Sequence, residues 1–456
     1  MPFLSRLRRP GTRKAGAVAL TVAVAALMAA CGGDHPDSIF HQRTEINRDV
    51  DFLFKILIYA GTAVFIFVEA ILVWTLIKYR ARPGQAEPEH VHGNTTLEIA
   101  WTVIPLIILA IIGFPTVKII MKTQAKARSD ALQVEVIGHQ WWWEFRYPQF
   151  TATGANGKVD TLVTANELYL PIGKTVNFAL KTKDVIHSFW IPALAGKRDL
   201  ITNHTNYLWF TPDSSCEGAW NGACVEYCGA SHANMRFKTF TVTQADFDGW
   251  VAHQLTPAPN PMAPAAPTTT TAAAQPTTGA ARPTEPQTQP STPAANQPGA
   301  GVPASPAPQT PVTQAGYAGF PREKMPAYAV PQTPIPAGLN FDDNLLANAN
   351  PANGPNLLLK GTCVGCHIIR GNPMMASPIG PVLSHIGSRT TIGAGLFPND
   401  ARHLARWIKN APKMKPGIIM PTLGAGEYDP VRKGQSLVKL TDQEIADLVA
   451  YLLTLK

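Results

Sequence analysis

Two stretches of the sequence gather side chains that bind soft metals. In the first, "ACVEYCGASHANM", Cys224 and Cys228 stand four positions apart, His232 follows after four more and Met235 after three more. His187 lies upstream in "DVIHSFWIP". Two thiols, an imidazole and a thioether at this spacing could form a disulfide, hold a structural zinc ion, or bind a softer transition metal. The stretch by itself leaves these three uses open.

The second stretch, "CVGCH", is the attachment sequence of c-type haem. Cys363 and Cys366 would form thioethers with the haem vinyl groups, and His367 would bind the iron from one face. A structural zinc site would need a second pair of ligands, and a redox dithiol would not need the histidine. We therefore expect a covalent haem c in this part of the chain.

The sixth ligand of the haem iron must come from elsewhere in the sequence. Met420 in "KPGIIMPTL" follows His367 by 53 residues and is our candidate. Methionine ligation suits electron transfer, because a closed iron site discourages other chemistry. Pro381 in "GPVL" would accept a hydrogen bond from the second ring nitrogen of His367. Three further methionines remain rivals for the iron: Met374, Met375 and Met414.

The N-terminus directs the chain to a membrane. Residues 1–30 combine a basic start with the apolar run "AGAVALTVAVAALMAA", which predicts a secretory signal peptide. Cys31 follows at once and resembles the lipid-modified cysteine of a bacterial lipoprotein; an uncut membrane anchor is the alternative. Either interpretation places the exported part in an oxidising compartment.

Two apolar stretches, at about residues 56–77 and 97–120, are each long enough to cross a bilayer. With an exported N-terminus, they predict a transmembrane hairpin whose short loop faces the cytoplasm. Glu69 lies in the middle of the first span, where a carboxylate is costly, so it is a candidate for proton handling. The hydrophobic fraction of 45% against 15% charged residues fits such a membrane protein, and no nucleic-acid partner is expected.

The exported part changes composition twice. Short alternating apolar runs predict a β-sandwich or barrel, and the Pro-, Ala- and Thr-rich segment after them predicts an extended linker. The chain then regains globular composition and ends in "TDQEIADLVAYLLTLK", whose capping box at Thr441 and Glu444 predicts a final helix. The expected division is a signal peptide at 1–30, an N-terminal segment with the hairpin at 31–130, a β domain at 131–255, a linker at 256–337 and a small α-helical domain at 338–456.

Taken together, these motifs resemble a known family. The pattern C-x-E-x-C followed by His and Met, with D-V-x-H-S upstream, is similar to the binuclear copper (CuA) site of cytochrome c oxidase subunit II. "GHQWWWEF" and "LEIAWTVIPLIIL" also match that family, and the match covers about residues 40–255. With the haem motif attached, the chain resembles the subunit II–cytochrome c fusion of some bacterial oxidases. The implied fold is a multidomain membrane protein with a two-helix hairpin, a cupredoxin-like β-sandwich, a Pro-rich linker and a small all-α cytochrome c domain.

The resemblance implies roles for individual residues. Glu226 would bind copper through its backbone carbonyl and a magnesium ion at the subunit I interface through its side chain. Trp141 would be the point where electrons enter the copper domain, with core packing as the alternative. Glu98 would stand at the mouth of a proton path into subunit I. The residues that would bind copper through their side chains are His187, Cys224, Cys228, His232 and Met235.

The function implied by the resemblance is that of a respiratory haem–copper oxidase. Electrons would pass from an external donor through haem c and CuA to subunit I, which reduces oxygen to water and pumps protons; subunit III is a further expected partner. Both metal domains would lie on the outer side of the bacterial cytoplasmic membrane, and the oxygen site would lie outside this chain. The alternatives are the copper subunit of another terminal reductase, such as nitrous oxide reductase, and a membrane-tethered copper carrier that serves assembly. A quinol-oxidase subunit II is excluded if copper binds, because that branch lacks these ligands.

Two further observations bear on the exported domains. Cys216 matches none of the family's ligands, and we interpret it as an incidental thiol. The formal net charge is +4 over residues 339–456 and −2 over residues 131–255. Opposite charges on a long tether predict weak, salt-sensitive and reversible docking. Cutting the linker would then make electron transfer between the two domains bimolecular.

Overall fold

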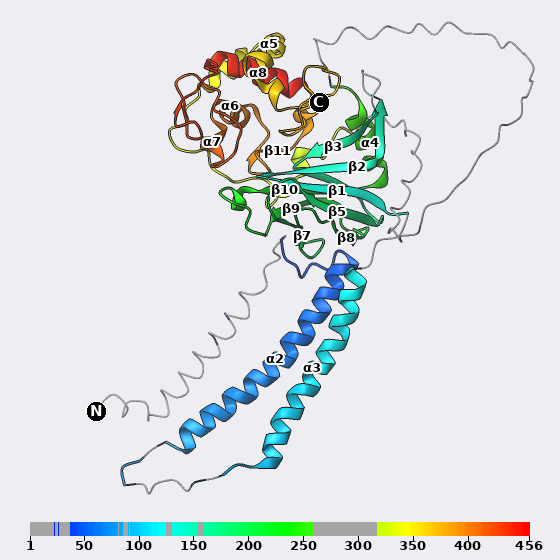
Figure 1. Cartoon of the computed structure of the whole chain (residues 1–456), viewed down its shortest axis with the longest axis vertical. Helices are drawn as coiled ribbons and strands as arrows, with labels where there is room; N and C mark the ends of the chain where they lie inside the picture. The colour runs from blue at the N-terminus through cyan, green and yellow to red at the C-terminus, as the bar shows by residue number, and fades with distance from the viewer. Residues whose placement is uncertain are drawn as a thin grey trace, which may run out of the picture.

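The structure is a computed structural model that describes residues 37–80, 82–84, 92–124, 130–153, 159–258 and 317–456, together with the single positions 22, 26 and 90. Cys31 and, apart from positions 22 and 26, the expected signal peptide lie outside the described residues, as do residues 259–316 of the expected linker. A helical hairpin leads into a β-sandwich, and a C-terminal helical domain is seated on the side of the sandwich away from the hairpin (Figure 1).

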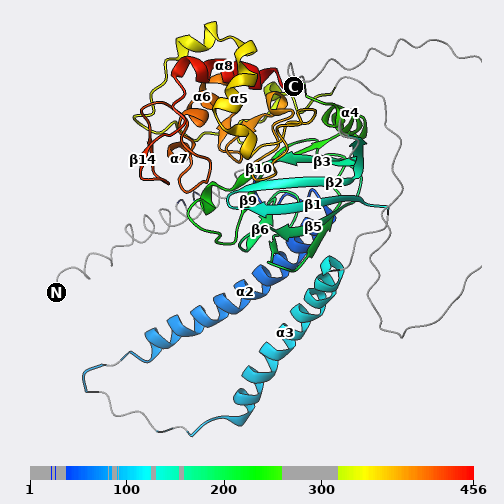
Figure 2. The same cartoon turned by 45° about the horizontal axis from the view of Figure 1, so that its top comes forward.

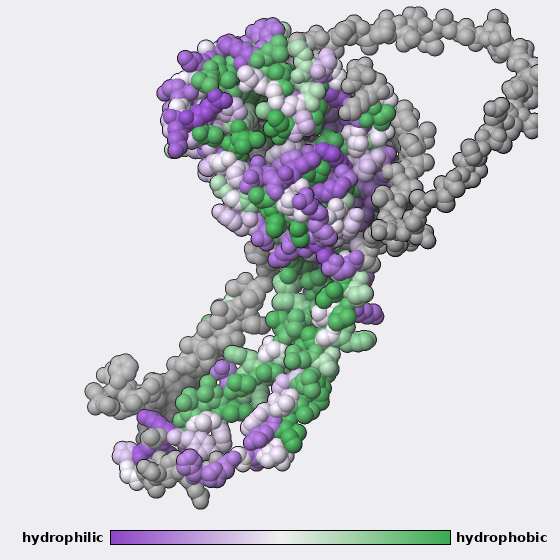
Figure 3. Space-filling model, in the orientation of Figure 1, coloured by the Kyte–Doolittle hydropathy of each residue, from purple (hydrophilic) through white to green (hydrophobic). Residues whose placement is uncertain are grey.

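The hairpin consists of two long antiparallel helices, α2 (Glu45–Lys78) and α3 (Thr95–Gln124). Both exceed the predicted spans, and both are long and apolar enough to cross a membrane. Their surface is mostly hydrophobic, whereas the globular domains show a mixture of polar and apolar areas (Figure 3). Exposed apolar surface of this extent needs lipid or partner helices to cover it. The chain is a membrane protein with two spanning helices.

The first turn of α2 is fastened to the β-sandwich. Thr44 caps the helix and also donates a hydrogen bond from its hydroxyl to the carbonyl of Leu194, at 2.5 Å. The Asn47 amide donates to the carbonyl of Pro192 at 3.2 Å. Because these polar groups are buried and paired, the sandwich is held in a fixed orientation at the end of the hairpin.

Two five-stranded sheets form the sandwich, in the orders β3-β2-β1-β5-β8 and β4-β10-β9-β6-β7. Strands β1 and β5 pair in parallel, as do β4 and β10, while the other pairs are antiparallel. The strands are β1 (Leu132–His139), β2 (Trp142–Thr153), β3 (Val159–Ala165), β4 (Glu167–Pro171), β5 (Val176–Thr182), β6 (His187–Trp190), β7 (Arg198–Leu200), β8 (Asn206–Phe210), β9 (Gly218–Cys224) and β10 (Arg236–Val242).

Aromatic side chains from both sheets fill the core between them. The rings of Trp143, Phe189 and Phe237 contact one another with centroids 5.0–5.7 Å apart. Such pairs contribute about 0.5–1.5 kcal/mol each beyond burial. Gly222 is required beside them, since an added Cβ would lie 2.1 Å from the Phe237 ring. A rigid aromatic core therefore supports the end of β9, where Cys224 lies.

The sandwich ends in a helix that the alternating pattern did not predict, α4 (Gln244–Leu255). Thr243 caps it by accepting a hydrogen bond from the backbone N–H of Asp246. Phe247 and Trp250 pack beneath it against Tyr147. This helix carries the chain from the sandwich toward the C-terminal domain (Figure 2).

Short helices joined by long loops make up the C-terminal domain. The predicted capping box of α8 is confirmed, with Thr441 and Glu444 each bonded to the other's backbone. The helices are α5 (Gly354–Lys360), α6 (Ala401–Lys409), α7 (Ala411–Met414) and α8 (Asp442–Thr454), with 3₁₀ turns η4 (Asp343–Asn348), η5 (Pro351–Asn353), η6 (Cys363–Gly365) and η7 (Ile386–Ser388). Two small antiparallel pairs, β11 (Thr391–Ile392) with β12 (Phe397–Pro398) and β13 (Tyr428–Asp429) with β14 (Gly434–Gln435), add to the predicted helices.

The C-terminal part of the expected linker differs from the sequence-based prediction. Residues 317–329, which include the 3₁₀ turn η3 (Arg322–Lys324), lie on the β-sandwich, where Phe320 and Ala329 join the sandwich core. The physical reason is composition, because three aromatic side chains in this short segment supply apolar surface that the preceding Pro-, Ala- and Thr-rich stretch lacks.

Candidate copper and haem sites

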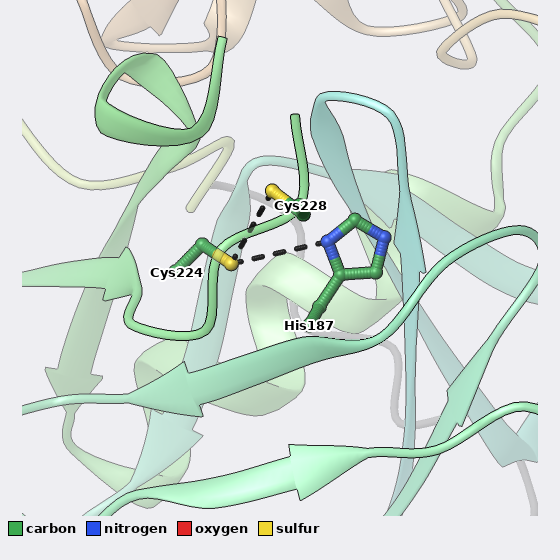
Figure 4. Close-up of side chains that lie close together, drawn as sticks. All are labelled: His187, Cys224 and Cys228. Carbon is green, nitrogen blue, oxygen red and sulfur yellow. Dashed lines mark hydrogen bonds between the residues drawn. The ribbon is translucent and has the colours of Figure 1, made fainter. Parts of the chain in front are cut away.

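The two cysteines of the first motif face each other at one end of the sandwich. Cys224 ends β9 and Cys228 lies in the loop that follows, and both are buried. Their sulfur atoms are 3.7 Å apart, which is too far for a disulfide bond of about 2.05 Å (Figure 4). The two cysteines are therefore free thiols in this structure, and of the three uses left open by the sequence their arrangement favours a metal site.

His187 approaches Cys224 from the neighbouring strand. It is the first residue of β6, is fully buried, and places its Nδ1 atom 3.8 Å from the Cys224 sulfur (Figure 4). Its other ring nitrogen lies 2.8 Å from a carboxylate oxygen of Asp184. A carboxylate behind a ligating histidine fixes the ring and its tautomer. Asp184 was not singled out from the sequence, although it stands three positions before His187.

The remaining predicted ligands surround Cys228. The Nδ1 atom of His232 is 3.6 Å from the Cys228 sulfur, and the sulfur of Met235 is 3.8 Å from it. The backbone carbonyl of Glu226 lies 3.3 Å from the Cys224 sulfur. Each cysteine thus has its own histidine, and the carbonyl of Glu226 lies near Cys224 whereas the thioether of Met235 lies near Cys228.

The charge state of the two thiols suits a soft metal. Hydrogen bonding from Cys228 lowers the pKa of Cys224 to about 3, and the adjacent Cys224 raises the pKa of Cys228. Without a metal the two sulfurs therefore share one proton. Thiolate and imidazole donors with a thioether fit copper, and the arrangement is compact enough for both thiolates to bridge two ions. Cys216 lies apart from this cluster, and burial raises the pKa of its thiol, as expected for an unreactive cysteine.

The haem motif lies at the wall of a deep apolar cavity in the C-terminal domain. Cys363, Cys366 and His367 all line this cavity. The Nδ1 atom of His367 is 2.8 Å from the carbonyl of Pro381, which is the predicted hydrogen bond. Burial lowers the pKa of His367, so the imidazole is neutral, as an iron ligand must be. Gly380 leaves room for this ring, because a Cβ there would lie 2.7 Å from the His367 ring.

Met420 is the methionine that lines the same cavity, whereas its three rivals do not. Met375 and Met414 are buried in the domain core, and the side chain of Met374 is about half exposed. Most of the side chains in the cavity wall are apolar, which limits the access of water to a bound macrocycle. These residues therefore fit a covalent haem with His367 and Met420 on its two faces. The apolar walls include Leu358, Leu383, Ile392, Leu404, Leu423 and Leu452.

Side chains of the β-sandwich complete the haem cavity. Gln140, Trp141, Trp142 and Asn166 all contribute to its lining. Trp141 is 9% exposed and donates a hydrogen bond from its indole nitrogen to the carbonyl of Cys228, at 2.9 Å. The Gln140 amide donates to the same carbonyl at 2.8 Å. Gln140 is not among the predicted site residues, although it precedes Trp141 in the stretch "GHQWWWEF".

Three predicted carboxylates are exposed at the surface of the chain. Glu98 is exposed in the first turn of α3, at the end of the hairpin far from the sandwich, and Glu69 is exposed in the middle of α2. The side chain of Glu226 is exposed as well. Among the described residues, the one group of three or more His, Cys, Asp or Glu side chains with metal-binding geometry is His187, Cys224 and Cys228, and it does not include the carboxylate of Glu226.

Comparisons with known families match three parts of the chain. Residues 41–119 match the family "Cytochrome C oxidase subunit II, transmembrane domain", and residues 132–242 match "Cytochrome C oxidase subunit II, periplasmic domain". Residues 351–456 match "Cytochrome c". The periplasmic-domain family implies copper of the CuA type, and the cytochrome c family implies haem c.

Individual relatives agree with these matches. Cytochrome c oxidase subunit 2 of Alkalihalophilus pseudofirmus is 28% identical over 414 residues, which cover 89% of this chain and 86% of that protein. The probable cytochrome c oxidase subunit 2 of Rickettsia bellii is 35% identical over 219 residues, or 46% of this chain and 78% of that one. The crystal structure of the periplasmic domain of subunit II of the Bradyrhizobium japonicum oxidase is 31% identical, covers 28% of this chain and 94% of that one, and has a TM-score of 0.23. The chain therefore belongs to the cytochrome c oxidase subunit II family, in a form that carries a C-terminal cytochrome c domain.

Proposed function

We propose that this chain is the subunit through which electrons enter a respiratory haem–copper oxidase. An external donor would reduce haem c, and the electrons would pass to a binuclear CuA centre and on to subunit I, where oxygen is reduced to water and protons are pumped. The proposal is supported by the family assignment and by the presence of both sets of ligands in one chain.

The observation that carries the proposal is the position of Trp141. Its ring forms part of the wall of the haem cavity, and its indole nitrogen is hydrogen-bonded to the carbonyl of the copper ligand Cys228 at 2.9 Å. One side chain therefore touches both candidate redox sites. A fixed aromatic ring joined to a ligand by a single hydrogen bond provides a short, dry route between them.

Copper would be held by the six predicted ligands, with Cys224 and Cys228 as bridges and one histidine on each ion. Sharing the charge of an added electron over two metals keeps the ligand geometry nearly constant, which favours rapid electron transfer. The protein contributes by preorganising these ligands: Asp184 orients His187, and Gln140 and Trp141 fix the Cys228 backbone.

The membrane-facing roles rest on the family resemblance and on the hairpin geometry. We place the chain in a bacterial cytoplasmic membrane, with both metal domains on the outer side. Subunits I and III would cover the exposed faces of α2 and α3. Glu98, at the far end of the hairpin, would then serve a proton path on the cytoplasmic side, and the exposed Glu226 would share a magnesium ion with subunit I.

Trp141→Phe tests the central observation. The ring remains but the N–H donor to the Cys228 carbonyl is lost, which removes the hydrogen-bonded step of the proposed route. A tenfold lower rate corresponds to a barrier about 1.4 kcal/mol higher. We expect unchanged copper and haem contents and an approximately tenfold slower reduction of copper by flash-reduced haem. Trp209→Phe, a half-buried tryptophan in β8, is the matched control. An unchanged rate in Trp141→Phe would remove this residue from the route.

A further inference from the structure

The segment that joins the two domains contacts the opposite domain at each of its ends. The residues that leave the β-sandwich pack on the haem domain, and the residues that lead into the haem domain pack on the β-sandwich. Ala258, which follows α4, is buried in the core cluster of the haem domain, and its backbone N–H donates to the carbonyl of Arg370 at 3.3 Å. Arg370 in turn reaches the sandwich, donating to the carbonyls of Leu255 at 3.4 Å and Thr161 at 3.3 Å. The last residues of the copper domain are therefore held by the haem domain.

The start of the haem half of the chain is held by the sandwich in the same way. We call residues 317–329 the strap. Within it, the Phe320 ring stacks on Phe240 with centroids 4.9 Å apart, and the Phe320 N–H donates to the Tyr169 hydroxyl at 2.9 Å. Farther along, the Tyr328 hydroxyl donates to the carbonyl of Ala219 at 3.0 Å. The strap covers strands β4, β10 and β9 before the chain enters the haem domain.

Glu167 joins the two domains through a buried carboxylate. It is 2% exposed at the start of β4, and one of its oxygens accepts hydrogen bonds from the backbone N–H groups of Thr390 at 2.8 Å and Thr391 at 3.0 Å. The hydroxyls of the same threonines lie 2.6 and 3.4 Å from that oxygen. All four donors come from the haem domain, and the positive charge of Arg389 lies close enough to interact with the carboxylate.

A second set of contacts closes the interface directly over Trp141. The ammonium group of Lys415 is buried and donates to the Trp141 carbonyl at 2.5 Å. Gly417 lies against the Trp141 ring, since an added Cβ would be 3.3 Å from it, and the Ser231 hydroxyl donates to the carbonyl of Pro416. The face of the sandwich that contains Trp141 is thus covered by the haem domain of the same chain.

From these contacts we propose that the haem domain is a permanently docked part of the copper domain, held by the strap and by Glu167. The proposal rests on the proposed function, and it adds that Trp141 is closed to external donors, so an external cytochrome or other donor must deliver its electrons to haem c. The occupant of the Trp141 surface is the haem domain itself.

The character of the interface favours a fixed pose over the weak docking expected from net charge. Among the described residues, the ion pairs lie within one domain or between the hairpin and the sandwich, so opposite surface charges do not bridge the two redox domains. The contacts across the interface are buried hydrogen bonds and aromatic packing. A buried carboxylate that accepts from four donors fixes the orientation of the haem domain on the β-sandwich, because any displacement would leave buried polar groups without a hydrogen-bond partner.

Cleavage of the full-length protein between residues 259 and 316 tests the dock without relying on electron transfer. A specific protease site is inserted there, the purified membrane protein is cut, and the preparation is washed at high salt on an affinity resin that holds the N-terminal fragment. We expect the haem-bearing fragment to remain in a one-to-one ratio with the N-terminal fragment, measured by mass and haem stain. Release of the haem fragment from the cut wild-type protein would overturn the proposal.

Two variants sharpen this test. Glu167→Ala removes the acceptor of the buried hydrogen bonds from Thr390 and Thr391, and Phe320→Ala removes the ring that packs on Phe240. Each variant should release the haem fragment at least about tenfold faster after cleavage, which corresponds to a loss of about 1.4 kcal/mol. Glu217→Ala, which removes an exposed carboxylate from the same domain, should release it no faster than wild type. Haem content and circular dichroism before cleavage report whether each variant has folded. Equal retention of the haem fragment in Glu167→Ala, Phe320→Ala and Glu217→Ala would exclude the strap and Glu167 as the contacts that hold the haem domain on the β-sandwich. Failure of copper to bind would overturn the proposed function and would leave fragment retention measurable.

Discussion

The copper site and the haem site are built in different ways. The copper ligands come from the start of β6, the end of β9 and the loop that follows it, and neighbouring ligand atoms lie 3.3–3.8 Å apart within a single domain. The haem ligands come from loops of a small domain, and four residues of the neighbouring sandwich complete their cavity. The copper site is therefore a property of one fold, whereas the haem site in its complete form is a property of two domains together.

The largest effect should follow from removing a bridging thiol. Cys224→Ser should lose the binuclear centre as a whole, because each sulfur is proposed to bind both ions. We expect loss of both copper ions by elemental analysis, together with the mixed-valence absorption. Cys216→Ser is the control and should retain two copper ions, since that thiol lies outside the cluster. Retention of two copper ions in Cys224→Ser would contradict the assignment.

Removing the methionine that lines the haem cavity should change the iron and leave the attachment intact. Met420→Ala should keep the covalent haem and lose the sulfur-to-iron absorption at the red end of the visible spectrum. Met414→Ala should keep that absorption, because Met414 is buried in the domain core away from the cavity lining. If Met414→Ala loses the absorption and Met420→Ala keeps it, Met414 is the iron ligand, and the assignment of the domain as a cytochrome c still holds.

A smaller effect should come from the residue behind His187. Asp184→Asn keeps the size of the side chain and weakens its interaction with the Nε2 atom of His187. Loss of such a partner typically lowers metal affinity by about 10–100-fold. Competition with a copper chelator measures this affinity, and Asp199→Asn, in β7, is the matched control. Equal affinities in the two variants would show that Asp184 does not support the site.

The smallest effect concerns pH and the interface between the domains. Burial lowers the pKa of His385 to about 4, and this ring contacts His253, the carbonyl of Thr256 and the backbone of Lys456, near the positive charge of Arg389. A group with a depressed pKa binds protons more weakly in the folded state. The free energy of unfolding is therefore unaffected by His385 above the ordinary pKa of about 6.5, and it decreases as the pH falls from that value toward 4.

Lowering the pH from 7.5 to 5.5 should consequently destabilise the haem domain by about 1 kcal/mol through His385. Denaturant unfolding followed through the haem band measures this change. His385→Gln should show a smaller dependence on pH over the same interval, and Glu167, whose pKa burial raises, is present in both proteins and cancels in the difference. An identical pH dependence in the two proteins would exclude His385 as its source.

The sequence predicts the chemistry of this protein better than it predicts the relation between its domains. The copper and haem ligands sit in short motifs with strong spacing constraints, and the structure brings each set together. The interface between the two domains could not be predicted in this way, since Glu167 and Thr390 are more than two hundred positions apart and neither belongs to a motif. Net charge pointed to weak docking because surface charge is a property of composition, whereas a buried interface depends on a few specific contacts.

One signal of the dock was nevertheless present in the sequence. No aromatic residue occurs between Trp250 and Tyr317, and then Tyr317, Phe320 and Tyr328 follow within twelve positions. Aromatic side chains at the end of a Pro-rich stretch indicate a segment that packs against something. Which surface it covers could not be known before the sheet order placed Phe240 and Tyr169 side by side.

The rate of electron transfer from haem to copper in the cut protein tests the account most directly. After cleavage between residues 259 and 316, the haem is reduced by a light flash and copper reduction is followed at several protein concentrations. A permanently docked haem domain predicts a first-order rate that equals that of the uncut protein and does not change on dilution. A rate that falls in proportion to protein concentration after cleavage would show a mobile, tethered haem domain and would contradict the account.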